Sequence, residues 1–137
     1  MRVFLYGTLM DPEVAKRVSG EDGFLRSARP ALLPGWRRAR LRGTPFPTLV
    51  RAADGAVHGL LAEVPPEVLR RLHAYEGPLY RFLPVRVLCD GASIAARAWI
   101  APQARAVLDA APPGVARSPR PASTAARTAP PRRAARP

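Results

Sequence analysis

Short apolar segments separated by turn-forming residues recur along residues 1–100, and this spacing constrains the fold more than any other feature of the sequence. The segments typical of strands are residues 3–6, 24–33, 36–42, 48–50, 57–64, 81–88 and 93–100. Turns are predicted at Pro34-Gly35, Ala53-Asp54-Gly55 and Asp90-Gly91. Only two helices are clear. The pattern therefore predicts an α+β protein with a small mixed, mostly antiparallel curved sheet or barrel and flanking helices.

The chain begins with a strand, a glycine turn and a helix. Residues 3–6 are β-branched, aromatic or aliphatic, and Gly7 follows them. Asp11, as a helix N-cap before Pro12, predicts a helix over residues 12–18. A turn of this kind can direct several backbone N–H groups toward one point and bind a small anion. The alternative is a simple connection without a ligand.

Two other strands bear on packing and on partners. Residues 36–42 mostly alternate apolar residues with arginine, which is typical of a half-exposed strand with a solvated outer face. A surface for an acidic partner is the alternative. Gly59 interrupts the strand over residues 57–64 and indicates a bulge or the close approach of another segment.

The clearest helix covers residues 65–77, opened by proline and closed by Gly77. Glu76 lies on its last turn, where the helix dipole disfavours a negative charge. Shielding by nearby side chains would raise the proton affinity of this carboxyl group; the candidates are Tyr75, Leu79 and Tyr80. Such a group suits proton transfer. The alternative is a surface glutamate without a chemical role.

The formal net charge of +12 is concentrated toward the C-terminal end. Six of the 22 basic residues and none of the ten acidic residues lie in residues 112–137, so this segment carries half of the excess. Nearly all basic residues are arginine, and a GC-rich coding sequence produces this composition, which weakens the case for nucleic-acid binding. We expect one domain over residues 1–111 and a disordered Ala/Pro/Arg-rich tail over residues 112–137. A third helix can begin in residues 104–110.

Several kinds of chemistry have no signature in the sequence. His58, His73 and Cys89 do not have the spacing of a zinc site, and Cys89 fits a core position. Phosphate loops, dinucleotide fingerprints and serine-hydrolase elbows are absent. We therefore expect neither a metal nor an organic cofactor. No signal-peptide core or long apolar run occurs, so we expect a cytoplasmic protein without membrane association.

Four motifs occur in a characteristic order within residues 1–103. They are Tyr6-Gly7-Thr8-Leu9, Leu33-Pro34-Gly35-Trp36, Val57-His58-Gly59-Leu60-Leu61 and Leu72-His73-Ala74-Tyr75-Glu76-Gly77-Pro78-Leu79-Tyr80-Arg81. In this order the chain resembles the γ-glutamylcyclotransferase-like family, and more closely its branch of avirulence-induced plant proteins and their bacterial relatives.

The resemblance implies a small mixed barrel flanked by helices and an acyltransferase activity connected with glutathione metabolism. In that activity the γ-glutamyl group of a γ-glutamyl amide, peptide or amine cyclises to 5-oxoproline, and the amine is released. The resemblance implies that Glu76 is the general acid/base. The substrate-binding residues that it implies are Tyr6, Gly7, Thr8, Leu9 and Tyr80. The only partner expected is the small-molecule substrate, and the oligomeric state is not specified.

The sequence departs from the family pattern at two places. His73 stands where relatives usually have aspartate, which can alter the local support of Glu76. Relatives usually continue at this point with a tryptophan and further apolar residues, whereas this chain has the Ala/Pro/Arg-rich segment. A truncation or a change of reading frame would produce such a segment. A non-catalytic protein that binds a small ligand or a partner on the same fold is therefore an alternative to the enzyme. An arginine-rich nucleic-acid binder is a further one.

Overall fold

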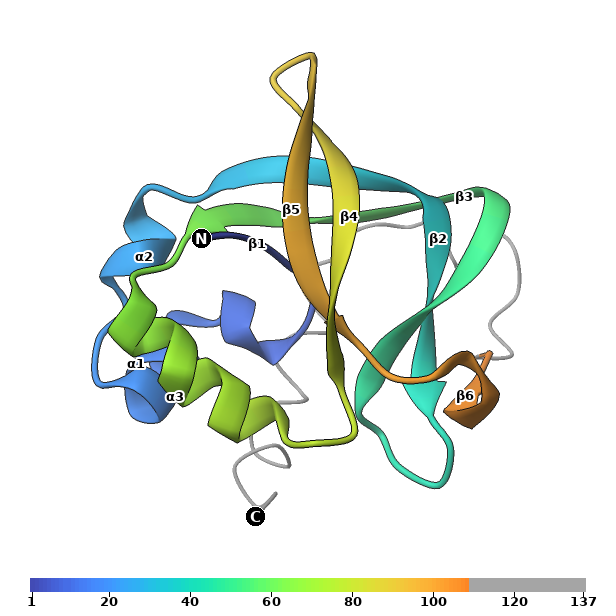
Figure 1. The fold of residues 1–137 in the computed structure, drawn as a ribbon, viewed down its shortest axis with the longest axis horizontal. Helices are drawn as coiled ribbons and strands as arrows, with labels where there is room; N and C mark the ends of the chain where they lie inside the picture. The colour runs from blue at the N-terminus through green and yellow to red at the C-terminus, as the bar shows by residue number, and fades with distance from the viewer. Residues whose placement is uncertain (109–137) are drawn as a thin grey trace.

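The computed structural model describes residues 1–108 of the chain (Figure 1). The described elements, in chain order, are β1 (Arg2–Leu5), the 3₁₀ helix η1 (Thr8–Met10), α1 (Pro12–Ser19), α2 (Gly23–Arg26), β2 (Arg29–Leu41), β3 (Pro47–Glu63), α3 (Pro66–Glu76), β4 (Arg81–Cys89), β5 (Ala92–Ile100), the 3₁₀ helix η2 (Gln103–Arg105) and β6 (Ala106–Val107).

Five of the strands form a closed barrel. The strand order is β3-β1-β5-β4-β2, and β2 pairs in turn with β3, which closes the sheet on itself. The short β6 adds to the other side of β2. The pairings are antiparallel except that of β1 with β5. The prediction of an α+β protein with a mixed, mostly antiparallel barrel is confirmed.

Strands β2 and β3 are longer than the sequence predicts, because two expected turns are wrong. Pro34 pairs with Ala56 and Trp36 pairs with Arg51, so both strands continue through this region with a shift in register. Gly35, with φ of +88°, takes a left-handed conformation that favours glycine. These turn-forming residues therefore make a bulge, which increases the twist of the strands.

Two further predictions from local patterns fail, and one holds. Part of the segment predicted as extended, residues 24–33, is the helix α2. Residues 104–107 do not begin a third helix; they belong to η2 and to β6, which pairs with the end of β2 at Arg40 and Leu41. The hairpin at Asp90-Gly91 is confirmed, with φ of 52° and 80° at these residues, because such a tight turn is specified locally. The expected domain end at residue 111 and the tail over residues 112–137 lie outside the described residues.

The three α-helices gather at one end of the barrel, on the left of Figure 1. Capping defines two of them: the Asp11 carboxylate accepts a hydrogen bond from the Glu13 N–H at 2.9 Å, and Gly77, with φ of 85°, ends α3. The buried face of α3 carries Val68 and Leu72. Among residues 1–108 no helix is both long and apolar enough to cross a membrane.

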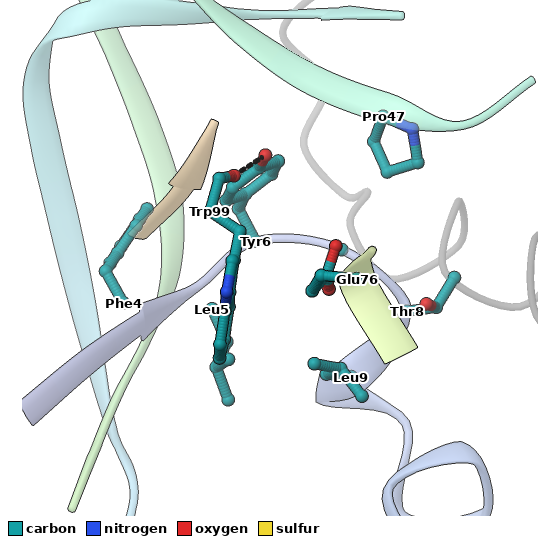
Figure 2. Close-up of a pocket in the computed structure, with 9 residues that line it drawn as sticks. Phe4, Leu5, Tyr6, Thr8, Leu9, Pro47, Glu76 and Trp99 are labelled. Atoms are coloured by element: carbon teal, nitrogen blue, oxygen red, sulfur yellow. Dashed lines mark hydrogen bonds between the residues drawn. The ribbon is translucent and has the colours of Figure 1, made fainter. Parts of the chain in front are cut away.

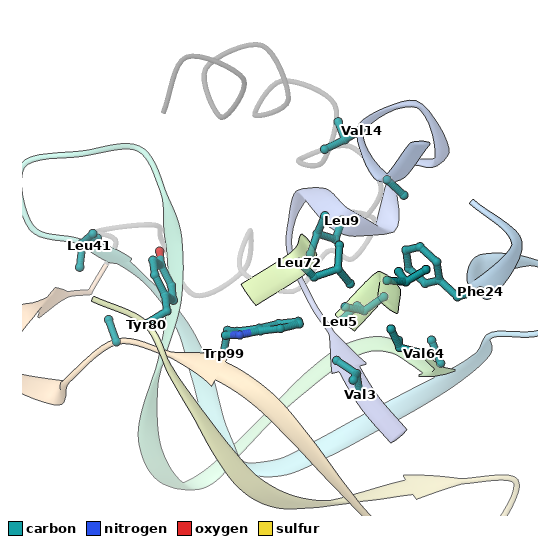
Figure 3. Close-up of a cluster of buried hydrophobic side chains, with 14 residues drawn as sticks. Val3, Leu5, Leu9, Val14, Phe24, Leu41, Val64, Leu72, Tyr80 and Trp99 are labelled. Atoms are coloured by element: carbon teal, nitrogen blue, oxygen red, sulfur yellow. The ribbon is translucent and has the colours of Figure 1, made fainter. Parts of the chain in front are cut away.

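β1 is buried on both of its faces and separates two apolar clusters. Val3 and Leu5 pack with the helices, and Figure 3 shows this cluster together with Leu72 and Trp99. Phe4 and Tyr6 belong to the cluster inside the barrel, which includes Cys89 as expected. The end of β1 therefore lies at the junction between the barrel and the helices, and the candidate site begins there.

Candidate functional site

A pocket lies where β1 ends. It contains about 310 Å³ of empty space, counting the part open to solvent (Figure 2). Its lining residues come from β1 and the following turn, from the start of β3, and from the ends of α3 and β5. They are Phe4, Leu5, Tyr6, Gly7, Thr8, Leu9, Pro47, Glu76 and Trp99. The structure thus brings together Glu76 and the turn at residues 6–9, which the sequence analysis had singled out separately.

The turn at residues 6–9 is closed by main-chain hydrogen bonds. The N–H of Met10 donates to the Gly7 oxygen at 3.1 Å, and the N–H of Asp11 donates to the Thr8 oxygen at 2.9 Å. A Cβ atom on Gly7 would stand 3.2 Å from Cγ of Pro47. The absence of a side chain at Gly7 therefore lets Pro47 pack closely against the turn.

The side chains of the turn connect it to the elements opposite. The Tyr6 hydroxyl donates to the main-chain oxygen of Trp99 on β5, the dashed line in Figure 2. The Thr8 hydroxyl shares a hydrogen bond of 3.3 Å with the Tyr75 hydroxyl on α3. Tyr6 and Thr8 are both buried. These contacts fix the turn against two other walls of the pocket.

Glu76 is a buried residue rather than a surface glutamate. Only 8% of its surface is exposed, and its carboxyl group lies among the residues of the turn in Figure 2. It occupies the last position of α3, and the helix ends just beyond it where the Gly77 N–H donates to the His73 oxygen. Burial of a carboxyl group in general favours its neutral form, and a partly shielded carboxyl suits proton transfer.

Tyr80 does not line the pocket. It is buried, and its hydroxyl donates to the main-chain oxygen of Pro47 at 2.7 Å. It therefore supports a pocket wall from behind. Pro47 and Trp99, together with Phe4 and Leu5, are lining residues that the sequence analysis missed. Pro47 is the first residue of β3 and Trp99 is near the end of β5, and neither position carries a motif.

Arg38, on β2, contacts both the residue after β1 and a residue of β3. Its guanidinium donates to the Tyr6 oxygen at 2.6 Å and to the His58 oxygen at 3.1 Å. Part of the side chain is exposed, but the guanidinium lies against main chain, and this desolvation lowers the pKa of Arg38; the charge interaction with Tyr6 partly offsets it. The His58 side chain does not line the pocket.

Gly59 permits the close packing of β1 on β3. A Cβ atom at this position would overlap the main-chain oxygen of Leu5 and the ring of Phe4. The predicted close approach of another segment is thus confirmed, and that segment is the strand leading to the pocket. Residues 1–108 contain no group of three or more His, Cys, Asp or Glu side chains placed to hold a metal ion.

The barrel, its helical end and the buried glutamate beside a glycine turn define a small α+β protein with an acidic group in a partly enclosed pocket. Residues 3–116 match the family described as gamma-glutamyl cyclotransferase, AIG2-like, and the chain belongs to this family. The resemblance noted in the sequence is confirmed.

Individual relatives agree with this assignment. AIG2-like protein A of Arabidopsis thaliana is 36% identical over 87 residues, covering 63% of this chain and 51% of that protein. The chain therefore spans about half the length of the curated relatives it matches. The solution structure of At3g28950.1 from Arabidopsis thaliana is similar with a TM-score of 0.62 and 26% identity, over 73% of this chain and 61% of that one.

A structure named gamma-glutamyl cyclotransferase has the same fold. Its TM-score is 0.61 with 18% identity, over 74% of this chain and 66% of that chain.

Proposed function

We propose that this protein is a γ-glutamylcyclotransferase. It converts a γ-glutamyl amide, peptide or amine into 5-oxoproline and releases the amine. The observation that carries the proposal is the buried carboxyl group of Glu76 in the same pocket as the turn at residues 6–9. Membership of the family supports it.

The substrate of this reaction carries its own nucleophile. Its α-amino nitrogen attacks the γ-carbonyl carbon, the new C–N bond closes a five-membered lactam, and the C–N bond to the leaving amine breaks. On the way to the lactam N–H, the α-ammonium nitrogen loses two protons. Glu76 takes one of them and gives it to the leaving nitrogen, and the second goes to the released amine, which departs as an ammonium ion, so the protons balance. Since the reaction is intramolecular, the site supplies no nucleophile; besides moving protons, it holds the substrate folded and keeps water out.

The remaining lining residues have roles that fit this chemistry. Backbone N–H groups of Gly7, Thr8 and Leu9 hold the substrate's α-carboxylate or the developing oxyanion. The apolar wall, including Leu5, Pro47 and Trp99, limits the access of water. The cyclisation needs neither a metal nor an organic cofactor.

The test is turnover of a panel of γ-glutamyl amino acids and γ-glutamyl amines, with 5-oxoproline and the free amine measured by mass spectrometry. Glu76→Gln keeps the size of the side chain but cannot carry the proton. We expect turnover to fall by about 10²–10⁴-fold, the usual effect of losing a general acid/base. Substrate affinity should be nearly unchanged, because the turn at Gly7, Thr8 and Leu9 holds the substrate. Stability should not fall, because loss of a negative charge at a helix C-terminus is mildly favourable.

Glu63→Gln is the matched control. Glu63 is an exposed carboxylate on β3, paired with Arg2 at 3.1 Å, and it does not line the pocket. This variant should retain full turnover. If Glu76→Gln cyclises the substrate at the wild-type rate, Glu76 has no part in the mechanism. A protein that binds 5-oxoproline or a γ-glutamyl compound without turnover would be a binding protein on the same fold.

A further inference from the structure

A side-chain hydrogen bond connects the Trp99 wall of the pocket to helix α3. The indole Nε1–H of Trp99 donates to Nδ1 of His73 at 3.1 Å. Trp99 lines the pocket and is only 4% exposed, whereas His73 is exposed. His73 precedes Glu76 by one helical turn. A solvent-accessible side chain therefore contacts the pocket wall from behind.

Aromatic neighbours hold the imidazole ring in place. It stands edge-on to Phe82, with ring centroids 4.7 Å apart, and edge-on to Trp99, with centroids 5.2 Å apart. Phe82 and Trp99 also contact each other at 4.7 Å. The hydrogen bond from Trp99 requires a lone pair on Nδ1, and an imidazole has one there only in the neutral form that carries its proton on Nε2.

We propose that neutral His73 is a positioning residue for the Trp99 wall, so that proton uptake by His73 disturbs the pocket and weakens substrate use. The activity readout of this proposal rests on the proposed function; the link between His73 and Trp99 does not.

The physical reason is the loss of the acceptor. A protonated imidazole carries N–H groups on both nitrogens, so two donors would face each other across the 3.1 Å contact. One ring must then move, or the indole N–H loses its partner, which is costly for a buried donor. The main-chain oxygen of Trp99 also accepts the Tyr6 hydroxyl, so a displaced Trp99 affects the turn as well.

Several charged groups lie on the elements packed around His73. Phe82 and Trp99, its ring partners on β4 and β5, do not titrate; Arg81 precedes Phe82 in the chain, and the Arg97 guanidinium lies 6.0 Å from the centre of the Phe82 ring. On α3, Arg70 lies one turn before His73 and Glu76 one turn after it. Histidine side chains in general change charge between about pH 5 and 8, which sets the pH range of the test.

The first experiment compares pH profiles of kcat/KM. His73→Asn places an amide oxygen near the position of Nδ1 and does not titrate, whereas His73→Leu removes the acceptor at every pH. Relative to His73→Asn, wild-type kcat/KM should fall by at least about five-fold below the midpoint of the histidine titration, the lower end expected for an unpaired buried donor. His73→Leu should resemble the acid form throughout. His58→Asn, at the other exposed histidine, is the matched control and should keep the wild-type profile.

The second experiment does not depend on activity. The indole N–H signal of Trp99, assigned by comparison with Trp36→Phe in nitrogen-15 NMR spectra, should shift with the titration of His73. The shift should be absent in His73→Asn. Either of two results would overturn the proposal. One is an indole signal that does not shift as His73 titrates, and the other is an identical pH profile for wild type, His73→Asn and His73→Leu. If no γ-glutamyl compound is turned over, the proposed function fails, but the indole titration still decides whether His73 holds Trp99.

Discussion

The two sides of the pocket are built differently. The turn at residues 6–9 is one continuous piece of chain, closed by its own main-chain hydrogen bonds. The opposite side combines Pro47, Glu76 and Trp99 from three distant elements. Each of Pro47 and Trp99 is supported by a hydrogen bond from behind: the Pro47 oxygen accepts from the Tyr80 hydroxyl, and the Trp99 indole donates to His73. The turn side thus depends on local backbone geometry, whereas the opposite side depends on contacts between segments far apart in the sequence.

This comparison predicts that changes on the turn side have the larger effects. Gly7→Val places a branched side chain where a Cβ atom alone would already stand 3.2 Å from Pro47. We expect substrate use to fall by about 100-fold or more, the size of effect that a misplaced substrate can cause. Titration with substrate or 5-oxoproline measures it.

The φ of Gly7 is −123°, which lies outside the left-handed region that favours glycine. Circular dichroism is the control. Unchanged affinity in a folded Gly7→Val protein would mean that the turn is only a connection.

Gly59→Ala tests the packing of β3 against β1, the strand that leads into the turn. The added methyl group overlaps the Leu5 oxygen and the Phe4 ring, so β1 must shift away from β3. We expect a loss of about 1–3 kcal/mol in the free energy of unfolding, as for other overpacked cores. Thermal or denaturant unfolding measures it. Gly23→Ala is the matched control, because Gly23 likewise has no positive φ and an added Cβ atom there would meet only side-chain atoms, at 3.4 Å and beyond. Equal losses in the two variants would contradict the crowding argument.

A pair of tyrosine variants compares the two sides directly. Tyr80→Phe removes the 2.7 Å hydrogen bond to Pro47, and Tyr75→Phe removes the 3.3 Å contact with Thr8. We expect each to cost about 0.5–1.5 kcal/mol at most. Tyr80→Phe should raise KM several-fold with little change in kcat, because Pro47 shapes the pocket but takes no part in the proton transfer by Glu76. Tyr75→Phe should raise KM less, since the turn is closed by its own main-chain hydrogen bonds. A larger KM effect for Tyr75→Phe would reverse the comparison.

Removal of residues 112–137 should have the smallest effect of all. This segment contains almost no large apolar side chain and therefore has little to bury. We expect an unchanged midpoint of thermal unfolding for residues 1–111. A fall of more than about 4 °C, roughly what 1 kcal/mol produces in a domain of this size, would show that the tail packs on the domain.

Much of the fold and half of the pocket could be predicted without the structure. Asp11 and Gly77 mark helix ends through contacts within a few residues, and the Asp90-Gly91 hairpin is equally local. Glu76 and the Gly7 turn were identified as candidate site residues from such signals and from the family resemblance. What they do chemically stays a prediction.

The sequence by itself determined the α+β pattern of short strands, the ends of α1 and α3 and the position of a glutamate at a helix terminus, because these depend on neighbours along the chain. Only the tertiary structure decided that Pro34 and Gly35 form a bulge instead of a turn, since pairing with β3 continues on both sides of them. It also decided that Pro47 and Trp99 meet Glu76 and that Tyr80 stands behind the wall. Closure of the barrel brings these distant segments together, and no local pattern of residues records which of them will meet.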